Sequence, residues 1–522
     1  MNAVTSTTIK PKLNLRIMFT SALLRDAGIV SCAALLLAAA FPKIGAAWLV
    51  PLGTAGLFWI WQDASWKRAA LLGWFAGLIF FAIDFAWVGH TVGRYVGIFG
   101  PFLAFGPALI EAPFFALAGV LAAFAYRRMR PGVAPLGAAA AFTICEWLRS
   151  VGVLAAPFDQ LGYSQADTPL RAIAAYAGTY GITFALCAIG AYLADAIHRR
   201  TWRPLAVAAS LLTILTVAAW IAWPARRLAP PTVPVAAIQG NIAQSFKWNS
   251  LDLAVRRYTA MTRRASAARP VLIVWPETVI PTGLNVDSVL LEQFKRLARE
   301  NHTTIVAGSL DIRTPEIYNA VFIFSPHSTY AIYHKRQLVP FAEWFPGRRF
   351  LSWLPYVSLL NSGVTPGRTD GVYSTGAFAI APLICWESAF ADLAFAQVRR
   401  GADLLVVSTD DAWFGATSGP YMHAQIAQLR AVETGAYVVR AAATGISGII
   451  APDGTWQARA PLARRMVVGG RVGPRVRTLF SRIGPTRIAL VLIGLYTLPL
   501  IHLLPMPPAE IDSGTDEWSG DD

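Results

Sequence analysis

The sequence predicts a membrane protein of two parts: about eight transmembrane helices, and a layered α/β or α+β domain. Hydrophobic residues make up 55% of the 522 residues and charged residues only 14%, a composition too apolar for an ordinary soluble protein. Seven apolar segments precede residue 224 and an eighth follows residue 482. Between them, short strand patterns alternate with amphipathic helical patterns over about 250 residues, enough for a separate core.

The first part is expected over residues 1–224. Its apolar segments fall at about residues 28–42, 46–62, 68–88, 100–126, 134–150, 172–195 and 205–223. If the N-terminus is cytoplasmic, the inside loops carry three basic clusters and the outside loops only scattered cations. The clusters are Lys67 and Arg68; Arg127, Arg128 and Arg130; and Arg199, Arg200 and Arg203. The outside cations are Lys43, Arg94, Arg149 and Arg171. This asymmetry predicts that the seven helices deliver the next domain to the extracytoplasmic side.

That domain is expected over residues 225–482, and residues 483–505 are predicted to be a last transmembrane helix. Residues 506–522 form an acidic tail that is expected to be disordered in the cytoplasm. Strands are predicted at 233–239, 271–275, 303–309, 319–325, 330–334, 378–385, 403–409, 436–442 and 447–452, and helices near 250–266, 286–300, 388–399 and 420–434.

The net charge of +15 could suit nucleic acid. However, much of the excess lies in clusters beside apolar segments, where such residues determine membrane topology, so no nucleic-acid partner is expected. The sequence contains neither a His/Cys cluster with metal-ligand spacing nor a glycine-rich phosphate loop. We therefore expect no metal and no cofactor.

Three predicted strands end at a residue with useful chemistry. Glu277 follows the strand VLIVW, Lys335 follows YAIYH, and Cys385 ends FAIAPLIC just before a turn and a helix. Cys385 is also the only cysteine outside the apolar segments. A thiol nucleophile needs a base, and its tetrahedral intermediate needs a positive group or backbone N–H donors nearby. Each residue alone has an ordinary explanation, as a turn glutamate, a surface lysine or a core cysteine, but together they indicate a metal-free nucleophilic site.

The segments WPET, YHKRQLVPFAE and ICWES resemble the three signatures of the carbon–nitrogen hydrolase (nitrilase) superfamily. The whole chain resembles the apolipoprotein N-acyltransferase family of Gram-negative bacteria. That resemblance also rests on EWLR, LGYSQ, QGNIAQSFKW, DAWFG and GPYMHAQIAQLRAVETG. It implies an αββα sandwich that faces the periplasm, seated on eight transmembrane helices of the inner membrane.

The resemblance also implies residue roles. Cys385 would be the nucleophile, Glu277 the general base and Lys335 the oxyanion-stabilising residue, while Glu343 would orient the lysine. Glu387 and Trp386 would support the nucleophile, although a purely structural role for Glu387 is equally consistent. Residues expected to contact substrate are Trp248, Trp344, Phe350 and Trp353. Five positions depart from the family pattern without removing a catalytic group: Gln337, Ala342, Trp344, Trp386 and Asp410. The effect of Asp410 on the pKa of the thiol is left open.

The implied reaction moves an acyl chain from the sn-1 position of a phospholipid, typically phosphatidylethanolamine, to a lipoprotein. The acceptor is the α-amine of a diacylglyceryl-cysteine, and a thioester on the cysteine is the intermediate. A monomer is expected. Two alternatives remain: a membrane-tethered amidase that acts on a soluble substrate, and a non-catalytic lipid-binding protein that retains the fold.

Residues 343–363 are unusually aromatic for a periplasmic loop. Their aromatic residues include Trp344, Phe350 and Trp353, and Arg348 and Arg349 lie among them. Tryptophan partitions well into the membrane interface, and arginine pairs with phosphate. One hypothesis is an arm that dips into the interface, admits an acyl chain and then shields the thioester; the alternative is an apolar segment that covers the domain's own core.

Overall fold

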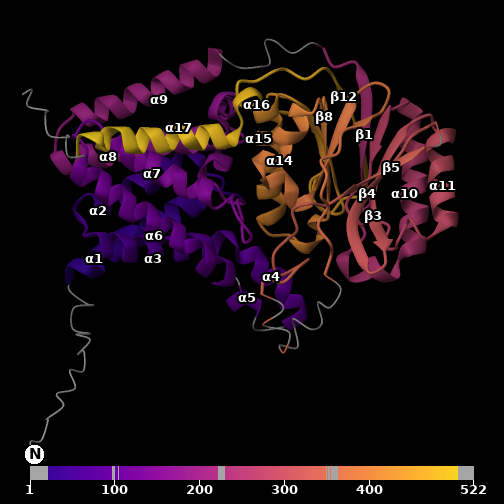
Figure 1. Ribbon diagram of the computed structural model, residues 1–522, viewed down its shortest axis with the longest axis horizontal. Coiled ribbons are helices and arrows are strands. Elements are labelled where there is room, and N and C mark those ends of the chain that lie inside the picture. The colour runs from indigo at the N-terminus through magenta and orange to yellow at the C-terminus, as the bar shows by residue number, and fades with distance from the viewer. Residues whose placement is uncertain are drawn as a thin grey trace, which may run out of the picture.

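The computed structural model describes residues 21–96, 100–103, 105–221, 230–327, 329–347, 350, 353 and 363–503. A bundle of long helices forms one half of the molecule and two sheets flanked by helices form the other (Figure 1). The helices of the first half are α1 Ser21–Ala39, α2 Val50–Asp63, α3 Trp66–Asp84, α4 Ala86–Val96, α5 Gly100–Leu103, α6 Phe105–Arg128, α7 Ala134–Leu148, α8 Ala174–Arg199, α9 Arg203–Ile221, α16 Phe480–Ile483 and α17 Pro485–Thr497.

Helices occupy each of the predicted apolar segments. Within the described ranges, four helical stretches are long and apolar enough to cross a membrane: Ser21–Ala39, Trp66–Asp84, Phe105–Arg128 and Pro169–Arg199. Three shorter apolar stretches accompany them, at Ala134–Leu148, Arg203–Ala218 and Pro485–Ile501. The protein is therefore a membrane protein with at least four candidate spans.

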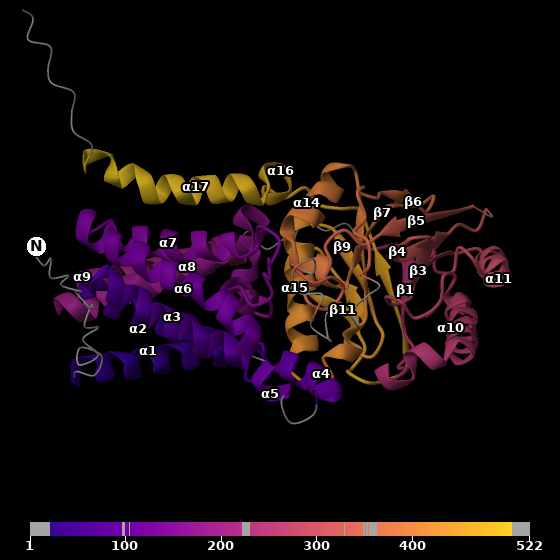
Figure 2. The same cartoon turned by 60° about the horizontal axis from the view of Figure 1, so that its bottom comes forward.

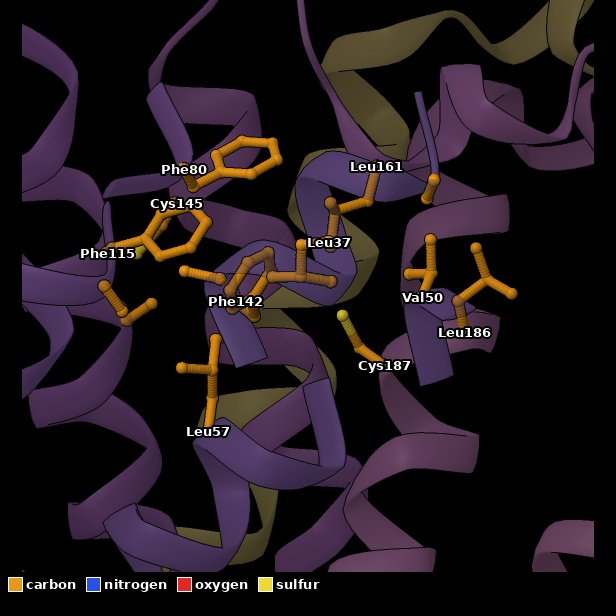
Figure 3. Close-up of a cluster of buried hydrophobic side chains, with 14 of the residues drawn as sticks. Leu37, Val50, Leu57, Phe80, Phe115, Phe142, Cys145, Leu161, Leu186 and Cys187 are labelled. Atoms are coloured by element: carbon orange, nitrogen blue, oxygen red, sulfur yellow. The ribbon is translucent and has the colours of Figure 1, made fainter. Parts of the chain in front are cut away.

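The helices pack around a shared apolar core. Figure 3 shows Phe80 of α3, Phe115 of α6 and Phe142 of α7 gathered with leucines from α1, α2 and α8. Phe115 stacks on Phe80 with ring centroids 5.5 Å apart and meets Phe142 edge-on at 5.0 Å. Cys145 and Cys187 are buried in this core and have no polar role.

The helix ends that carry the basic clusters lie together. The side chain of Arg68 binds Asp26 near the start of α1 at 2.6 Å, and Arg127 donates to the carbonyl of Ala64. By contrast, two cations predicted for the opposite loops touch the sheet-bearing half. Lys43 donates to Ala416 O at 2.6 Å, and Arg171 donates to Asp453 O at 2.7 Å. The residues of the basic clusters and the cations Lys43 and Arg171 thus lie at different ends of the bundle.

The second half contains two six-stranded sheets. Their strands are β1 Val233–Gln239, β2 Leu272–Val274, β3 Thr304–Arg313, β4 Glu316–Phe324, β5 Tyr330–His334, β6 Tyr373–Ser374, β7 Ala379–Ile384, β8 Leu404–Thr409, β9 Tyr437–Ala442, β10 Gly448–Ile450, β11 Trp456–Arg459 and β12 Met466–Val472. The strand orders are β12-β1-β2-β3-β4-β5 and β11-β10-β9-β8-β7-β6. The strands at the centre of each sheet, β1-β2-β3 and β7-β8-β9, run parallel.

The two sheets stack face to face and helices cover their outer faces. Val235, Val306, Ile380 and Val406 belong to the buried cluster between the sheets. The first sheet is covered by α10 (Leu251–Ala265) and α11 (Ser288–Glu300), the second by α14 (Ala391–Arg399) and α15 (Gly419–Thr434) (Figures 1 and 2). This is the four-layer α-β-β-α arrangement that the family resemblance implies.

Three strands and one helix boundary differ from the sequence prediction. Strands β6, β11 and β12 were not predicted, because they are short or, in β12, contain a Gly-Gly pair and lie at the sheet edge. The helix expected at 388–399 begins only at Ala391, after a 3-10 helix over Cys385–Ala389. In that turn the side chains of Glu387 and Ser388 bond the backbone of Ile384 and Cys385 and so satisfy groups that a helix would use.

Helix α15 joins the halves, because it covers the second sheet and also packs on α8 (Figure 2). The backbone N–H of Thr179 in α8 donates to Glu433 of α15 at 2.8 Å. Gly178 has a φ of +63°, and a Cβ there would lie 2.4 Å from the Phe480 ring, so the kink in α8 requires glycine. Glu146 of the EWLR motif accepts from the N–H of Leu161 in LGYSQ at 2.7 Å. The bond between Thr179 and Glu433 holds α15, in the outer helix layer of the sandwich, against α8, while the bond between Glu146 and Leu161 lies within the membrane half.

Candidate active site

The structure brings Glu277 and Lys335 together at the ends of β2 and β5. The Lys335 Nζ donates to Glu277 Oε1 at 3.0 Å and to Glu343 Oε1 at 2.9 Å. Only 1% of Lys335 is exposed, and Glu277 is also buried. A buried ammonium between two carboxylates has its charge compensated, which makes it stable in the interior. Cys385, at the end of β7 in the facing sheet, lies within the electrostatic influence of both Glu277 and Lys335.

Asn319 of β4 completes this group, although its place in the site was not predicted from the sequence. Its Nδ2 donates to Glu277 Oε1 at 2.7 Å and to Glu343 Oε1 at 2.9 Å. The other oxygen of Glu277 accepts from the N–H of Asp410 at 2.9 Å, and that of Glu343 from the N–H of Val339 at 2.8 Å. Both carboxylates are thus held by fixed donors. The sequence could have indicated Asn319 by its place at the start of the predicted apolar strand 319–325, because a buried amide needs hydrogen-bond partners.

Cys385 sits on a constrained backbone. Its φ is +50°, in the left-handed region that non-glycine residues rarely adopt. Burial raises the pKa of the thiol and the charge of Glu277 raises it further, while Lys335 and the contact with the Thr409 hydroxyl oppose them; the net direction is upward. With its raised pKa, Cys385 is a thiol at neutral pH, and a thiol needs a base if it is to act as a nucleophile.

The pKa values of Glu277 and Lys335 move apart. Burial acts to raise the pKa of Glu277, but Lys335, Lys247 and the hydrogen bond from Asn319 outweigh it, so the carboxyl is ionised at neutral pH. Burial acts to lower the pKa of Lys335, but Glu277 and Glu343 raise it above its usual value. The site therefore holds a carboxylate able to accept a proton beside a permanent cation.

These directions predict a flat pH profile for attack by the thiol. If Glu277 removes the thiol proton during attack, the rate is constant between pH 6 and 8, because Glu277 stays ionised and Lys335 stays protonated throughout. If attack required a preformed thiolate, the rate would rise about tenfold per pH unit below the raised pKa of the thiol. Single-turnover acylation measured at pH 6, 7 and 8 separates the two, and a tenfold rise per unit would contradict general-base catalysis by Glu277.

Glu387 has the contacts of a structural acceptor. Its Oε1 accepts from Tyr333 Oη at 3.0 Å and from the N–H of Arg336 at 2.7 Å, and its Oε2 accepts from the N–H of Ile384 at 2.7 Å. These bonds connect the loop that begins at Lys335 to strand β7, which ends just before Cys385. Glu387 therefore fixes the two sheets relative to each other at the site.

Asp410 is paired rather than free to act on the thiol. Its Oδ2 lies 2.5 Å from Lys247 Nζ, and both side chains are largely buried. Its charge is compensated locally, and its backbone N–H, which any residue would supply, holds Glu277. Asp410 thus departs from the family pattern without disturbing the backbone hydrogen bond to Glu277.

The aromatic residues expected to support the nucleophile (Trp386) or to contact the substrate differ in their positions. Trp386 is buried and stacks on Phe158 of the membrane half, with ring centroids 5.4 Å apart and planes inclined by 11°. Trp344 is half-buried, and its carbonyl accepts from the N–H of Phe341 at 2.7 Å. Phe350 and Trp353 are 80% and 75% exposed. Trp248 lies in the 3-10 helix Gln244–Asn249, and its side chain lies outside the described part of the structure.

Most of the aromatic segment, including Arg348, Arg349 and residues 354–362, also lies outside the described residues. Its two ends are described and they meet. The N–H of Val364 donates to the carbonyl of Glu343 at 3.1 Å, and the N–H of Gly367 donates to that of Lys335 at 2.7 Å. The chain on either side of the segment is therefore joined to the backbone of Glu343 and Lys335, two residues of the site. Within the described ranges, no cluster of three or more potential metal ligands occurs.

Comparisons with known proteins place the chain in a family. A model of the carbon–nitrogen hydrolase domain matches residues 234–471, and a model of the apolipoprotein N-acyltransferase N-terminal domain matches residues 33–192. A nitrilase-superfamily structure from Saccharomyces cerevisiae aligns with 19% identity and a TM-score of 0.38, over 47% of this chain and 91% of that one.

Relatives match over both halves. The apolipoprotein N-acyltransferase of Methylococcus capsulatus is 33% identical, over 84% of this chain and 88% of that protein. Those of Photobacterium profundum and Shewanella oneidensis are 30% identical, over 82% and 83% of this chain and 85% and 89% of theirs. The chain belongs to the apolipoprotein N-acyltransferase family.

Proposed function

We propose that this protein transfers an acyl chain from the sn-1 position of a membrane phospholipid to the α-amine of a lipoprotein's diacylglyceryl-cysteine. The observation that carries the proposal is the group formed by buried Glu277 and Lys335 with partly buried Glu343, beside the thiol of Cys385. Lipoprotein N-acylation is the activity that its relatives' names state. The phospholipid donor, with phosphatidylethanolamine as the first candidate, and the catalytic roles are our inference.

In the first half-reaction, the sulfur of Cys385 attacks the ester carbonyl while Glu277 accepts the thiol proton. Negative charge develops on the carbonyl oxygen, and Lys335 stabilises it. The ester C–O bond then breaks, the glycerol oxygen takes the proton from Glu277, and a lysophospholipid leaves. The acyl chain remains on Cys385 as a thioester, which retains the acyl-transfer potential of the ester.

In the second half-reaction, the α-amine of the acceptor attacks the thioester. Glu277 removes a proton from the amine, the C–S bond breaks, and the proton returns to the sulfur. Water would compete for the thioester, so the half-life of the intermediate depends on its exclusion. The buried setting of Glu277, Lys335 and Glu387 supports such exclusion.

A two-stage incubation tests this function. Enzyme is first mixed with phospholipid labelled in the sn-1 chain, freed of lipid, and then mixed with a diacylglyceryl lipopeptide with a free α-amine. We expect label on the enzyme after the first stage and on the lipopeptide amine after the second, with an N-acetylated lipopeptide as the control that stays unlabelled. Label released only as free fatty acid would instead identify a hydrolase, as would cleavage of a soluble amide without lipid.

We also propose a topology. Residues 1–224 with seven transmembrane helices, and 483–505 with an eighth, would hold a catalytic domain over 225–482 in the periplasm of the bacterial inner membrane, and 506–522 would be a cytoplasmic tail. The grouping of the basic helix ends, as in the contacts of Arg68 and Arg127, supports the cytoplasmic assignment of that end.

Cysteine labelling checks this orientation. Single cysteines at exposed positions, Ser288→Cys on α11 and Thr201→Cys between α8 and α9, are introduced with Cys32→Ala and Cys385→Ala as background. In inner-membrane spheroplasts, Ser288→Cys should react with an impermeant thiol reagent, whereas Thr201→Cys should react only after permeabilisation. The opposite pattern would reverse the assignment of the two sides.

Phe350 and Trp353 are proposed to contact lipid, together with Trp248 and Trp344 near the site. Two large aromatic side chains at 80% and 75% exposure argue against a core role for these two positions. Replacing both with serine should raise the KM for phospholipid by about tenfold, since it removes apolar contact without changing the reacting groups. The matched control is Val286→Ser with Val289→Ser, an exposed apolar pair in the same domain. A loss of folded protein equal to the loss of activity would show that Phe350 and Trp353 stabilise the domain instead.

A further inference from the structure

A chain of buried polar side chains lies behind the nucleophile. His423 Nε2 is 2.8 Å from Ser388 Oγ and 3.1 Å from the carbonyl oxygen of Cys385. Ser388 Oγ also donates to that carbonyl at 2.9 Å. On its other side, His423 Nδ1 is 2.9 Å from Asp411 Oδ1. Four elements contribute to the chain: the turn after β7, helix α15, the segment after β8, and β9 through Arg440.

Asp411 sets the direction of this chain. Arg440 Nη2 donates to Asp411 Oδ2 at 2.6 Å, and Thr409 Oγ1 donates to Asp411 Oδ1 at 2.8 Å. Burial acts to raise the pKa of Asp411, but Arg440 and His423 outweigh it and lower the pKa to about 2. An ionised carboxylate only accepts hydrogen bonds, so Nδ1 of His423 carries the hydrogen of that contact. The ring is thereby oriented with Nε2 toward Ser388. Burial and Arg440 lower the pKa of His423, so the ring is neutral and Nε2, which carries no hydrogen, can only accept the hydroxyl hydrogen of Ser388.

The hydrogen bonds of this chain converge on the peptide that follows Cys385. The left-handed φ of Cys385 is unfavourable for a residue with a side chain and persists only where its surroundings hold it. On the N-terminal side, Glu387 accepts from the N–H of Ile384. On the C-terminal side, the hydroxyl of Ser388 lies between the carbonyl of Cys385 and Nε2 of His423, so its one hydrogen is shared between these two acceptors. Because a peptide unit is planar, fixing this carbonyl also fixes the direction of the N–H of Trp386.

We propose that His423 is a positioning residue for acyl transfer, which acts through its Nε2 on the hydroxyl of Ser388 and, through that hydroxyl, on the carbonyl of Cys385. Held by Asp411, it keeps the peptide after the nucleophile in the orientation required for attack. The proposal goes beyond the proposed function but rests on Cys385 being the nucleophile. His423 is fully buried and does not touch the substrate, so its effect on the reaction is exerted through Cys385.

Three substitutions of His423 separate this role from a structural one. The amide of glutamine lies four bonds from Cα, as Nε2 does, and can restore the contact with Ser388 and Cys385. The amide of asparagine lies three bonds from Cα, as Nδ1 does, and can restore only the contact with Asp411. Phenylalanine fills the space and restores neither. If the role of His423 were only to pair Asp411, asparagine would be the better replacement.

The experiment measures the single-turnover rate of Cys385 acylation by labelled phospholipid, and the melting temperature, for each full-length variant. We expect His423→Gln within about threefold of the wild type, and His423→Asn and His423→Phe slower by about 100-fold, the scale of a small misplacement of reacting groups. The KM for phospholipid should stay unchanged, because the substrate does not contact the residue. Thr434→Val is the control: it removes a buried hydroxyl that donates to Arg430 O at 2.7 Å, on the same helix but away from the site.

Equal rates for His423→Asn and His423→Gln would overturn the proposal, as would a wild-type rate for His423→Phe. If the His423 variants do not fold, Ser388→Ala carries the test, because it removes the hydroxyl from the same carbonyl. It should slow acylation by about tenfold in folded protein, the cost of one lost positioning hydrogen bond, and an unchanged rate would contradict the proposal. Label retained by Cys385→Ala would instead refute the nucleophile assignment, which keeps the two failures distinct.

Discussion

Replacing Cys385 with serine is expected to abolish acyl transfer while the protein still folds and inserts into the membrane. A hydroxyl has a far higher pKa than a thiol, and a carboxylate such as Glu277 is too weak a base to activate it. The rate of lipopeptide N-acylation should fall by roughly 10³-fold or more, as when the nucleophile of another acyl-transfer enzyme is removed. The measurement is the transfer assay on purified protein, with melting temperature as the check on folding.

Cys32→Ser is the matched control, since Cys32 lies on the exposed face of α1, in the membrane half. It should leave the rate unchanged. Near-normal N-acylation by Cys385→Ser would show that another group carries the acyl chain.

Replacing Lys335 with methionine should cost both activity and stability. It removes the cation that stabilises the oxyanion, so acylation should fall by about 10²–10³-fold. It also leaves Glu277 and Glu343 buried with only the Asn319 amide between them. Removing one partner of a buried ion pair costs about 3–5 kcal/mol of the free energy of unfolding. The measurements are single-turnover acylation and denaturant unfolding of the same preparation.

The double variant Lys335→Met with Glu343→Gln separates the two effects. It removes one of the unpaired carboxylates and should recover part of the stability without recovering activity. If activity returned together with stability, Lys335 would be a structural residue and the oxyanion would be stabilised elsewhere. Lys295→Met on α11, which breaks only the contact with Glu292 at the surface, is the control and should change neither quantity.

Hydrophobic patterning predicted the larger features of the fold. Nine strands and four helices were expected in the second half at positions where the structure has them, because buried parallel strands such as β8 form continuous apolar runs. The pattern was least informative at the sheet edges. Strand β12 pairs along its whole length with β1, from Val233 with Val472 to Gln239 with Met466, yet its Gly-Gly pair and Arg471 interrupt the apolar run in the sequence.

The site residues at strand ends could be predicted from the sequence, but the residues that hold them in place could not. Glu277, Lys335 and Cys385 each follow a strand, and this position indicated that they could meet. The residues that hold them were not evident, because their contacts join distant parts of the chain. The N–H of Asp410 reaches Glu277 across 133 positions, and Asn319 reaches it across 42. In the sequence, His423 was noticed only as part of the motif GPYMHAQIAQLRAVETG. Its proposed role depends on how α15 packs behind the turn that contains Cys385.

We propose that Cys385 carries the acyl chain, and mass spectrometry of the protein can detect that adduct. The protein is incubated with phospholipid alone, without any lipoprotein, and its mass and its peptides are analysed by mass spectrometry. We expect one acyl group per protein, on the peptide that contains Cys385. Neutral hydroxylamine should remove it, as it removes a thioester. Efficient N-acylation of a lipopeptide by the same preparation, with no acyl adduct on Cys385 under any condition, would contradict it.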